Sequence, residues 1–524
     1  MRAALGLLFL ASCTTEDTVE RAEPLAPLPA PAPVATDRFR DAETCAQCHL
    51  AGEGTPVLHD AAGRNISPSL LWRSSLMGLA ARDPYYLAVF SEEIAADPDN
   101  ADAIAGVCTR CHAPAGHEEA GGALTFDDLV SGTSPAAVLG RGGVTCTLCH
   151  QIAAQGLGDE TSFTGGFDVG YQRRIFGRYP DPNINPMQLI VNYTPEGGSH
   201  IAQSELCGSC HTVVVRTAGG PVVEQATFLE WRSSSFVAQG KACQACHVPV
   251  VDEAGVAIAA PITTFSSSSS RVRTPVGRHT FVGGNSYVLS LIADAIEWSG
   301  AGVSRDEVLA SAARDEAHLR EAAELAVVDT RREGSVAVIT IKVTNLTGHK
   351  LPTGYPSRRM WLHVTASAGG SIVFESGGDD RFATQPHRDE VSAADEVQAW
   401  ESELVDDRGQ PTHRALDARR YGKDNRILPA GFAPASPSDR TRTAPVGVDG
   451  DATFVAGSDT VTYRLIGVPA GATIAVELLY QAIRPSTIDA IDRGNTPAGT
   501  RFVDLARARP VTPVVMATAS ATIP

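Results

Sequence analysis

The chain has 524 residues, of which 43% are hydrophobic and 20% charged, and this composition suits two or three globular domains. Its formal net charge of −17 argues against nucleic acid as a partner and against a polybasic membrane-binding surface. Aromatic residues make up only 6% of the chain, a low share for a core of this size. The interior therefore has room for large apolar groups other than side chains.

The first thirteen residues, MRAALGLLFLASC, predict a lipoprotein signal peptide. An apolar stretch follows Arg2, and Leu10–Cys13 resembles a bacterial lipobox, in which Cys13 is acylated and becomes the mature N-terminus. An ordinary signal peptide with an incidental cysteine is the alternative. Thr14 is not the aspartate that favours retention in the inner membrane. We therefore expect a lipid-anchored protein of the cell envelope, on the outer membrane and facing the periplasm or the exterior.

Residues 14–40 are rich in proline and alanine and have no hydrophobic period. This composition predicts an extended, semi-rigid tether. No later stretch is long and apolar enough to span a bilayer. Attachment to a membrane would therefore depend on the lipid.

Ten of the eleven cysteines fall in five C-x-x-C-H motifs within residues 41–265. Two thiols at this spacing add to the two vinyl groups of one haem, and the following histidine binds the iron from the proximal side. A zinc site does not require a histidine directly after each pair, and a thioredoxin-type redox site does not need five copies. The sequence therefore predicts five covalently bound c-type haems. In chain order the motifs are Cys45/Cys48/His49, Cys108/Cys111/His112, Cys146/Cys149/His150, Cys207/Cys210/His211 and Cys243/Cys246/His247.

The intervals between the motifs alternate between long and short. Successive first cysteines are 63, 38, 61 and 36 residues apart, which suggests that motifs 2 and 3, and motifs 4 and 5, form spatial pairs. The similar heptapeptides LWRSSLM, from Leu71, and EWRSSSF, from Glu230, are consistent with an internal duplication or with coincidence.

Eight stretches, in a fixed order over roughly residues 41–480, carry a family resemblance. They resemble bacterial multihaem c-type cytochromes related to the cytochrome c-554 and hydroxylamine-oxidoreductase group. The resemblance implies a helical haem-bearing domain, a C-terminal β-domain and a role in electron transfer. The stretches are LWRSSLMGLAARDPYYLAVF, CTRCHAPAGH, GVTCTLCHQI, HIAQSELCGSCHTV, FLEWRSSSFVAQGKACQACHVP, RHTFVGGN, GHKLPTGYPSRRMWLHV and YGKDNRILPAGF.

Members of this group often contain W-x-x-S-x-H, whose histidine is a distal haem ligand. Trp72 and Ser75 match this motif, but Met77 stands in the place of the histidine. Met77 either ligates a haem through its thioether or packs in the core, and His59 is the replacement in the second case. The corresponding residue of EWRSSSF, Phe236, cannot ligate and would pack against haem.

A six-coordinate haem needs a second axial ligand, and nine histidines lie outside the motifs. Their local sequence separates them: some lie in irregular loops, whereas His318 is expected on a solvated helix and His363 on a strand. His387 and His413 lie deep in the C-terminal part. The set expected to provide one distal ligand for each haem is Met77, His117, His200, His279 and His349.

The remaining chain predicts an α+β protein, in which a mostly helical and loop multihaem domain precedes a C-terminal β-sandwich-like domain. Residues 266–330 read as a helical connector, which begins with a serine-rich strap and contains a helix capped by Ser304. From 331 to 524 several segments alternate apolar and polar residues. In one of them Ile474, Val476, Leu478 and Tyr480 share a face. The loop that holds His349 is expected to cap one haem.

Three functions remain open. An electron-transfer cytochrome with saturated haems is favoured, working with redox protein partners and in an oligomer or complex. An oxidoreductase for a small nitrogen or sulfur compound would need one haem with an open distal position. Pentahaem nitrite reductases have a C-x-x-C-K site, but all five motifs here end in histidine, which favours a carrier over an enzyme. The β-domain could also serve as a docking module under either function.

Overall fold

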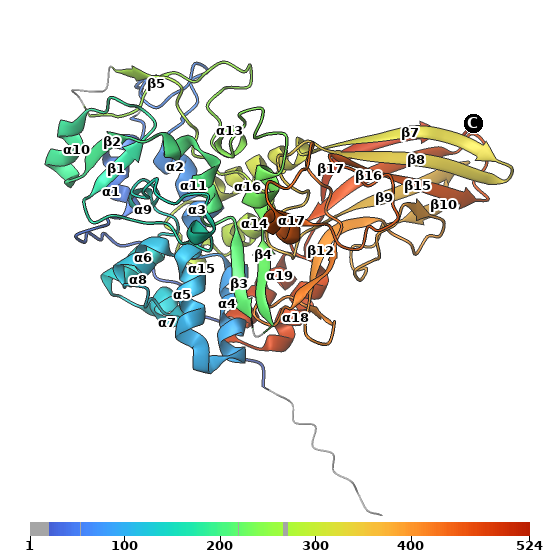
Figure 1. Cartoon of the computed structure of the whole chain (residues 1–524), viewed down its shortest axis with the longest axis horizontal. Helices are drawn as coiled ribbons and strands as arrows, with labels where there is room; N and C mark the ends of the chain where they lie inside the picture. The colour runs from blue at the N-terminus through green and yellow to red at the C-terminus, as the bar shows by residue number, and fades with distance from the viewer. Residues whose placement is uncertain (1–19, 53, 218, 266–270) are drawn as a thin grey trace, which may run out of the picture.

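The computed structural model describes residues 20–524 except 53, 218 and 266–270. The chain is an α+β protein, as predicted, with short helices gathered in one half and two β-sheets in the other (Figure 1). The signal peptide with Cys13 and the first part of the expected tether lie outside the described residues.

The motif-bearing half contains short helices joined by loops. They are α1 (Ala42–His49), α2 (Pro68–Arg73), α3 (Leu76–Leu79), α4 (Pro84–Ala96), η1 (Pro98–Asn100), α5 (Ala101–His112), α6 (Pro114–Glu119), α7 (Phe126–Ser131), α8 (Pro135–Gly140), α9 (Cys146–Cys149), η2 (Glu160–Ser162), α10 (Ile184–Val191), η3 (Ser199–Ala202), α11 (Ser204–Gly208), α12 (Thr227–Arg232) and α13 (Gln244–His247). Three small two-stranded sheets lie among them: β1 (Arg174–Gly177) with β2 (Thr194–Gly197), β3 (Val213–Thr217) with β4 (Gly220–Gln225), and β5 (Ala260–Pro261) with β6 (Val272–Arg273).

Local capping explains where several of these helices start. Asp41 accepts a hydrogen bond from the backbone N–H of Thr44 at the start of α1, the helix of the first motif. Asp83 caps α4 in the same way, and Pro84 occupies the first helical position, where its missing N–H costs nothing.

Three helices connect the halves: α14 (Ser286–Asp294), α15 (Ile296–Ser299) and α16 (Arg305–Arg320). The predicted Ser304 cap of α16 is confirmed and forms a capping box with Glu307. The helical prediction up to residue 330 is wrong, because β7 begins at Ala323. Residues 323–333 pair antiparallel with β8, so the sheet overrides the helix-forming tendency of this segment.

The second half is a β-sandwich. One sheet has the order β13-β12-β9-β16-β17, with β10 beside β9 and β14 beside β12, and the other has the order β11-β15-β8-β7. The strands are β7 (Ala323–Glu333), β8 (Val336–Asn345), β9 (Arg359–Ala368), β10 (Ser371–Ser376), β11 (Glu390–Val391), β12 (Ala399–Val405), β13 (Pro411–Thr412), β14 (Arg420–Asp424), β15 (Ser458–Ile466), β16 (Thr473–Gln481) and β17 (Val514–Thr522). Helices α17 (Pro437–Thr443), α18 (Pro485–Gly494) and α19 (Pro497–Ala508) lie between these strands in the sequence, and α18 and α19 pack against α4 of the motif-bearing half (Figure 1).

Alternating side chains from both sheets form one continuous core. Ile339 and Ile341 of β8 meet Leu362 and Val364 of β9, and all four are fully buried. The predicted inward face of β16 is also buried, from Ile474 to Tyr480. This half is therefore filled by side chains, and its core continues into helices α4, α14 and α16.

Residues 20–40 differ from the extended tether expected over 14–40. The backbone N–H groups of Leu25 and Leu28 donate to the carbonyls of Pro497 and Trp298, the Trp298 indole donates to the carbonyl of Leu25, and Leu28 is buried. Phe39 is also fully buried. Apolar residues that follow no helical or strand spacing, such as Leu28 and Phe39, are enough to pack this proline-rich segment against the rest of the protein. None of the described helices has the length and apolarity needed to cross a membrane.

Candidate haem-binding centre

All five C-x-x-C-H motifs open onto one cavity of about 1970 Å³ in the motif-bearing half. Pockets for a single drug-sized ligand measure roughly 300–1,000 Å³, so this space suits several large groups. Apolar and aromatic side chains line it, among them Trp72, Phe90 and Phe281, and loops from the β-sandwich close one side. A wall of this kind fits haem rings, which are large, flat and apolar.

Four of the five motif histidines are held in the form that binds a metal through Nε2. Nδ1 of His49, His112, His150 and His247 lies 2.6–3.2 Å from a backbone carbonyl oxygen. A carbonyl can only accept, so Nδ1 carries the proton and the Nε2 lone pair stays free. Burial lowers the pKa of all five rings, His211 to about 4, which keeps them neutral.

His279 faces the third motif histidine, His150. Their ring centroids are 6.3 Å apart and their planes differ by 28°. Two imidazoles that bind one metal ion from opposite sides have centroids roughly 6 Å apart, because each metal–nitrogen bond is about 2 Å and each ring centre lies about 1 Å beyond its nitrogen. Nδ1 of His279 donates to the carbonyl of Gly277 over 3.1 Å, so its Nε2 is also free.

His349 faces the fifth motif histidine, His247, in the same manner. Their centroids are 6.5 Å apart and their planes differ by 23°. Nδ1 of His349 lies 2.9 Å from the carbonyl oxygen of Lys350, and burial lowers its pKa to about 4. The loop that follows β8 therefore brings His349 into the cavity from the β-sandwich.

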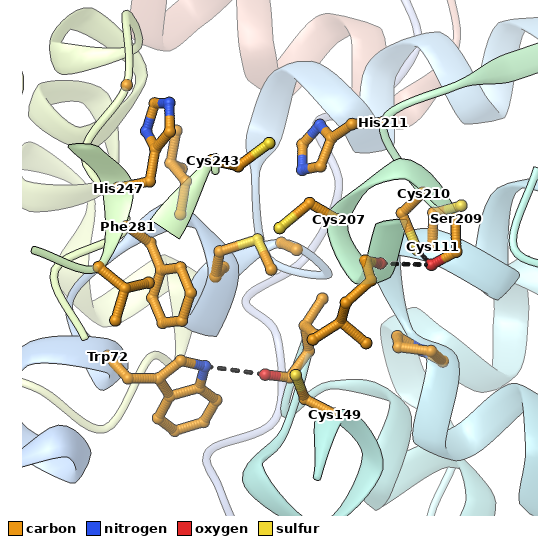
Figure 2. Close-up of a pocket in the computed structure, with 18 of the residues that line it drawn as sticks. Trp72, Cys111, Cys149, Cys207, Ser209, Cys210, His211, Cys243, His247 and Phe281 are labelled. Atoms are coloured by element: carbon orange, nitrogen blue, oxygen red, sulfur yellow. Dashed lines mark hydrogen bonds between the residues drawn. The ribbon is translucent and has the colours of Figure 1, made fainter. Parts of the chain in front are cut away.

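Met77 lies in the cavity wall on α3. Its backbone carbonyl accepts the N–H of Val144, and the indole of Trp72 donates to the carbonyl of Val144 over 2.8 Å (Figure 2). These contacts hold the W-x-x-S-x-M segment against the chain just before the third motif. Ligation of a haem by the Met77 thioether stays a prediction.

His117 and His200 are buried, but among the described residues they are not part of the cavity wall. Nδ1 of His117 contacts the hydroxyl of Thr109 at 2.9 Å. Nε2 of His200 contacts the carbonyl oxygen of Ile152 at 2.9 Å, so this nitrogen is already used. The structure does not bring these two rings to the motifs as it brings His279 and His349, and their role as distal ligands stays a prediction.

His318 was expected on a solvated helix, and that expectation is wrong. Its ring lies in the cavity wall, 5.4 Å from the ring of His247 and at 68° to it. The helical period of α16 could have indicated an inward face, because Val308, Ser311, Asp315 and Leu319 on the same helix are buried. His59, by contrast, lies outside the wall of described residues, with Nδ1 on the carbonyl of Val57.

The other histidines of the β-sandwich contact carboxylates. His363 lies between Glu477 and Glu375 on the sheet, and His413 pairs with Glu92.

His387 pairs with Asp451 and lies within metal-binding distance of Asp459. Its Nδ1 accepts from the amides of Gln398 and Asn425, whose oxygens are held by backbone N–H groups. Nε2 of His387 therefore carries the proton, which disfavours a metal there.

The motif thiols face one another across motifs. The thiol of Cys146 raises the pKa of Cys45, that of Cys210 raises the pKa of Cys111, and that of Cys243 raises the pKa of Cys207, each helped by burial. Figure 2 shows Cys111 beside Cys210 and Cys207 near Cys243. Motifs 4 and 5 are thus neighbours, as the spacing suggested. Cys111 of motif 2 faces Cys210 of motif 4, although the spacing suggested that motif 3 would be the neighbour of motif 2.

No protein-family model matches the chain, and no curated protein matches it in sequence. Among solved structures, a penta-heme cytochrome c552 from Thermochromatium tepidum is similar, with a TM-score of 0.52 and 18% identity. The alignment covers 94% of this chain and 100% of that one. The chain thus shares its fold with this penta-heme cytochrome c552. At this identity the similarity establishes the shared fold, and the chemistry must be argued from the residues of this chain.

Proposed function

We propose that this chain binds five c-type haems covalently and transfers electrons through them. The observation that carries the proposal is the single apolar cavity onto which all five C-x-x-C-H motifs open. When bound, haem iron alternates between ferric and ferrous states and so moves one electron at a time. The protein would attach each ring through two cysteines, present a neutral histidine to it and exclude water from its faces.

The histidine pairs support this role more sharply than the motifs alone. His150 with His279, and His247 with His349, have the separation of two axial ligands of one metal. A haem with two histidine ligands has no free position for a substrate, so these two centres suit electron transfer. Met77 and His318 also lie in the cavity wall and are the further candidates for distal ligands.

The cell envelope is the proposed location, with a lipid anchor at Cys13 on the outer membrane. Support comes from the lipobox sequence and from the haem motifs, since covalent haem attachment and a secretion signal belong together. The partners would be redox proteins that donate and accept electrons.

A haem count tests the proposal. The mature protein should contain five haems by pyridine haemochrome assay and by intact mass, and replacing Cys146 and Cys149 by alanine should leave four. The same number in both proteins, or bound zinc in place of haem, would contradict it. Replacing His279 by alanine should keep five haems and convert about one of them from low spin to high spin.

An oxidoreductase function is the second candidate, and the surroundings of motif 2 favour it. Burial raises the pKa of Glu93 and of Glu224 to about 7, so each can exchange a proton near neutral pH. The ring of Tyr86 stacks on His112 with a centroid separation of 3.8 Å. Reduction of small nitrogen or sulfur compounds needs such protons. Carbon monoxide binding to the reduced wild-type protein would support an open haem, and its absence would leave the carrier function alone.

A further inference from the structure

The loop that carries His349 contacts one fully buried acidic residue of the motif-bearing half. Glu230 lies on α12, within EWRSSSF, and is 0% exposed. Its Oε2 accepts from the backbone N–H of Lys350 over 3.1 Å and from the hydroxyl of Thr353 over 2.5 Å. Lys350 directly follows His349, so this carboxylate fixes the backbone on the C-terminal side of the ring.

Glu230 is part of a buried group of four charges. Its Oε1 is 3.0 Å from Nη1 of Arg426, which also pairs with Asp424 over 2.7 Å. Asp424 in turn binds Nζ of Lys350 over 2.6 Å. Burial acts to raise the pKa of Asp424, but Arg426 and Lys350 lower it to about 2, so it is charged. Two anions and two cations balance, and buried charges persist at low cost only when they are paired in this way.

Other contacts fix the loop from its remaining sides. The Asn345 side chain donates to the carbonyl of His349 over 2.8 Å and accepts from the N–H of Thr347. On the cavity side, a Cβ placed on Gly348 would lie 2.7 Å from the ring of Phe236 and 3.2 Å from that of Trp231. Both rings belong to the segment that contains Glu230, so this segment contacts the loop through its charge and through its aromatic surface.

We propose that Glu230 is the positioning residue for His349: it holds the loop so that the imidazole faces His247 across the fifth haem site. This inference rests on the proposed function. It adds a role for the segment EWRSSSF, in which Phe236 cannot ligate a haem. EWRSSSF does more than pack against haem, since its carboxylate sets the distal ligand of the fifth motif. The negative charge of Glu230 contributes to this positioning, because the buried guanidinium of Arg426 contacts the carboxylate and restrains it.

Spectroscopy of the purified, haem-loaded protein tests the proposal. His349→Ala supplies the full effect, a high-spin ferric signal and carbon monoxide binding at about one haem in five. Glu230→Ala should approach it, because both contacts to the loop are lost. Glu230→Gln should fall between this variant and the wild type, since the amide oxygen can still accept from Lys350. The reduction potential of one haem should shift in the same order.

The matched control is Glu401→Gln. Glu401 is also 0% exposed and pairs with a lysine and an arginine, Lys423 at 3.1 Å and Arg484 at 3.3 Å, but it lies on β12, away from the described cavity wall. This variant should keep the wild-type spectrum. A general loss of stability would instead alter both glutamate variants alike, and that result would overturn the proposal.

The combined variant Glu230→Ala, His349→Ala should match His349→Ala in spectrum and potential, because Glu230 acts through that ring. An additional change in the combined variant would overturn the proposal, as would wild-type spectra for Glu230→Ala and Glu230→Gln. If the alanine variant does not accumulate, Glu230→Gln decides alone. A wild-type protein without five haems would defeat the proposed function, whereas five haems with unchanged Glu230 variants would defeat this inference only.

Discussion

The two halves of the molecule fill their interiors in different ways. The β-sandwich is filled by its own side chains, and Ile339, Ile341, Val461 and Val476 are among those with at most 1% exposure. The motif-bearing half instead surrounds a cavity of about 1970 Å³ with short helices and loops. Regular secondary structure is therefore needed where side chains form the core, and it can be sparse where bound groups form it.

Residues from both halves form the interface between them. His349 and Lys350 come from the end of the sandwich, yet one faces a motif histidine and the other pairs within a buried charge group. The sandwich thus supplies part of the wall of a cavity that lies in the other half.

The largest effect is expected when haem attachment is prevented. In cells that lack cytochrome c maturation, the chain should reach a state in which residues 42–265 exchange amide hydrogens fast and are cut by protease. The cavity wall would have no atoms to pack against, while the strands of the sandwich should stay protected. Hydrogen exchange measured by mass spectrometry checks this. Equal protection of both halves would show that the cavity does not depend on bound groups.

A smaller effect is expected from Ile341→Ala in the sandwich. Ile341 is 0% exposed, and such truncations cost about 2–5 kcal/mol of unfolding free energy. Urea unfolding followed by far-ultraviolet circular dichroism should show the loss, with an unchanged haem spectrum before the transition. Ile372→Ala is the matched control, because Ile372 is 59% exposed and its loss should cost little. A haem spectrum that changes before the sandwich unfolds would contradict the independence of its core.

The smallest effect is expected at the connection between the halves. Ser304→Ala removes the capping box of α16 and should cost about 1 kcal/mol. Arg320→Ala, at the other end of the helix, removes only an exposed pair with Glu316, worth about 0.3–0.5 kcal/mol. Thermal unfolding distinguishes them. Since α16 also carries His318 into the cavity wall, a larger loss for Ser304→Ala than this estimate would show that the halves are coupled through α16.

Patterns within one segment were predictable from the sequence, whereas pairings between distant segments were not. The alternation of residues 336–345 predicted the bounds of β8, and Ser304 predicted the start of α16. The segment after α16 was read as helix because its residues favour helices, and only its partner β8 makes it a strand. The cysteine spacing predicted the proximal histidines. The sequence could not show that Nε2 is free in His279 and His349 but used in His200, because backbone carbonyls from other segments decide this.

If the protein is anchored to a membrane as proposed, the docking of residues 20–40 would limit how far the body can lie from it. Arg21 is already paired with Asp504 of α19, and Ala22 is bonded to Asn495. If Cys13 is acylated as proposed, only the chain from Cys13 to Arg21 is left to span the gap, a fully extended reach of roughly 28 Å. The surface around α18 and α19 would then lie close to the lipid headgroups. Redox partners would have to bind at other faces of the molecule.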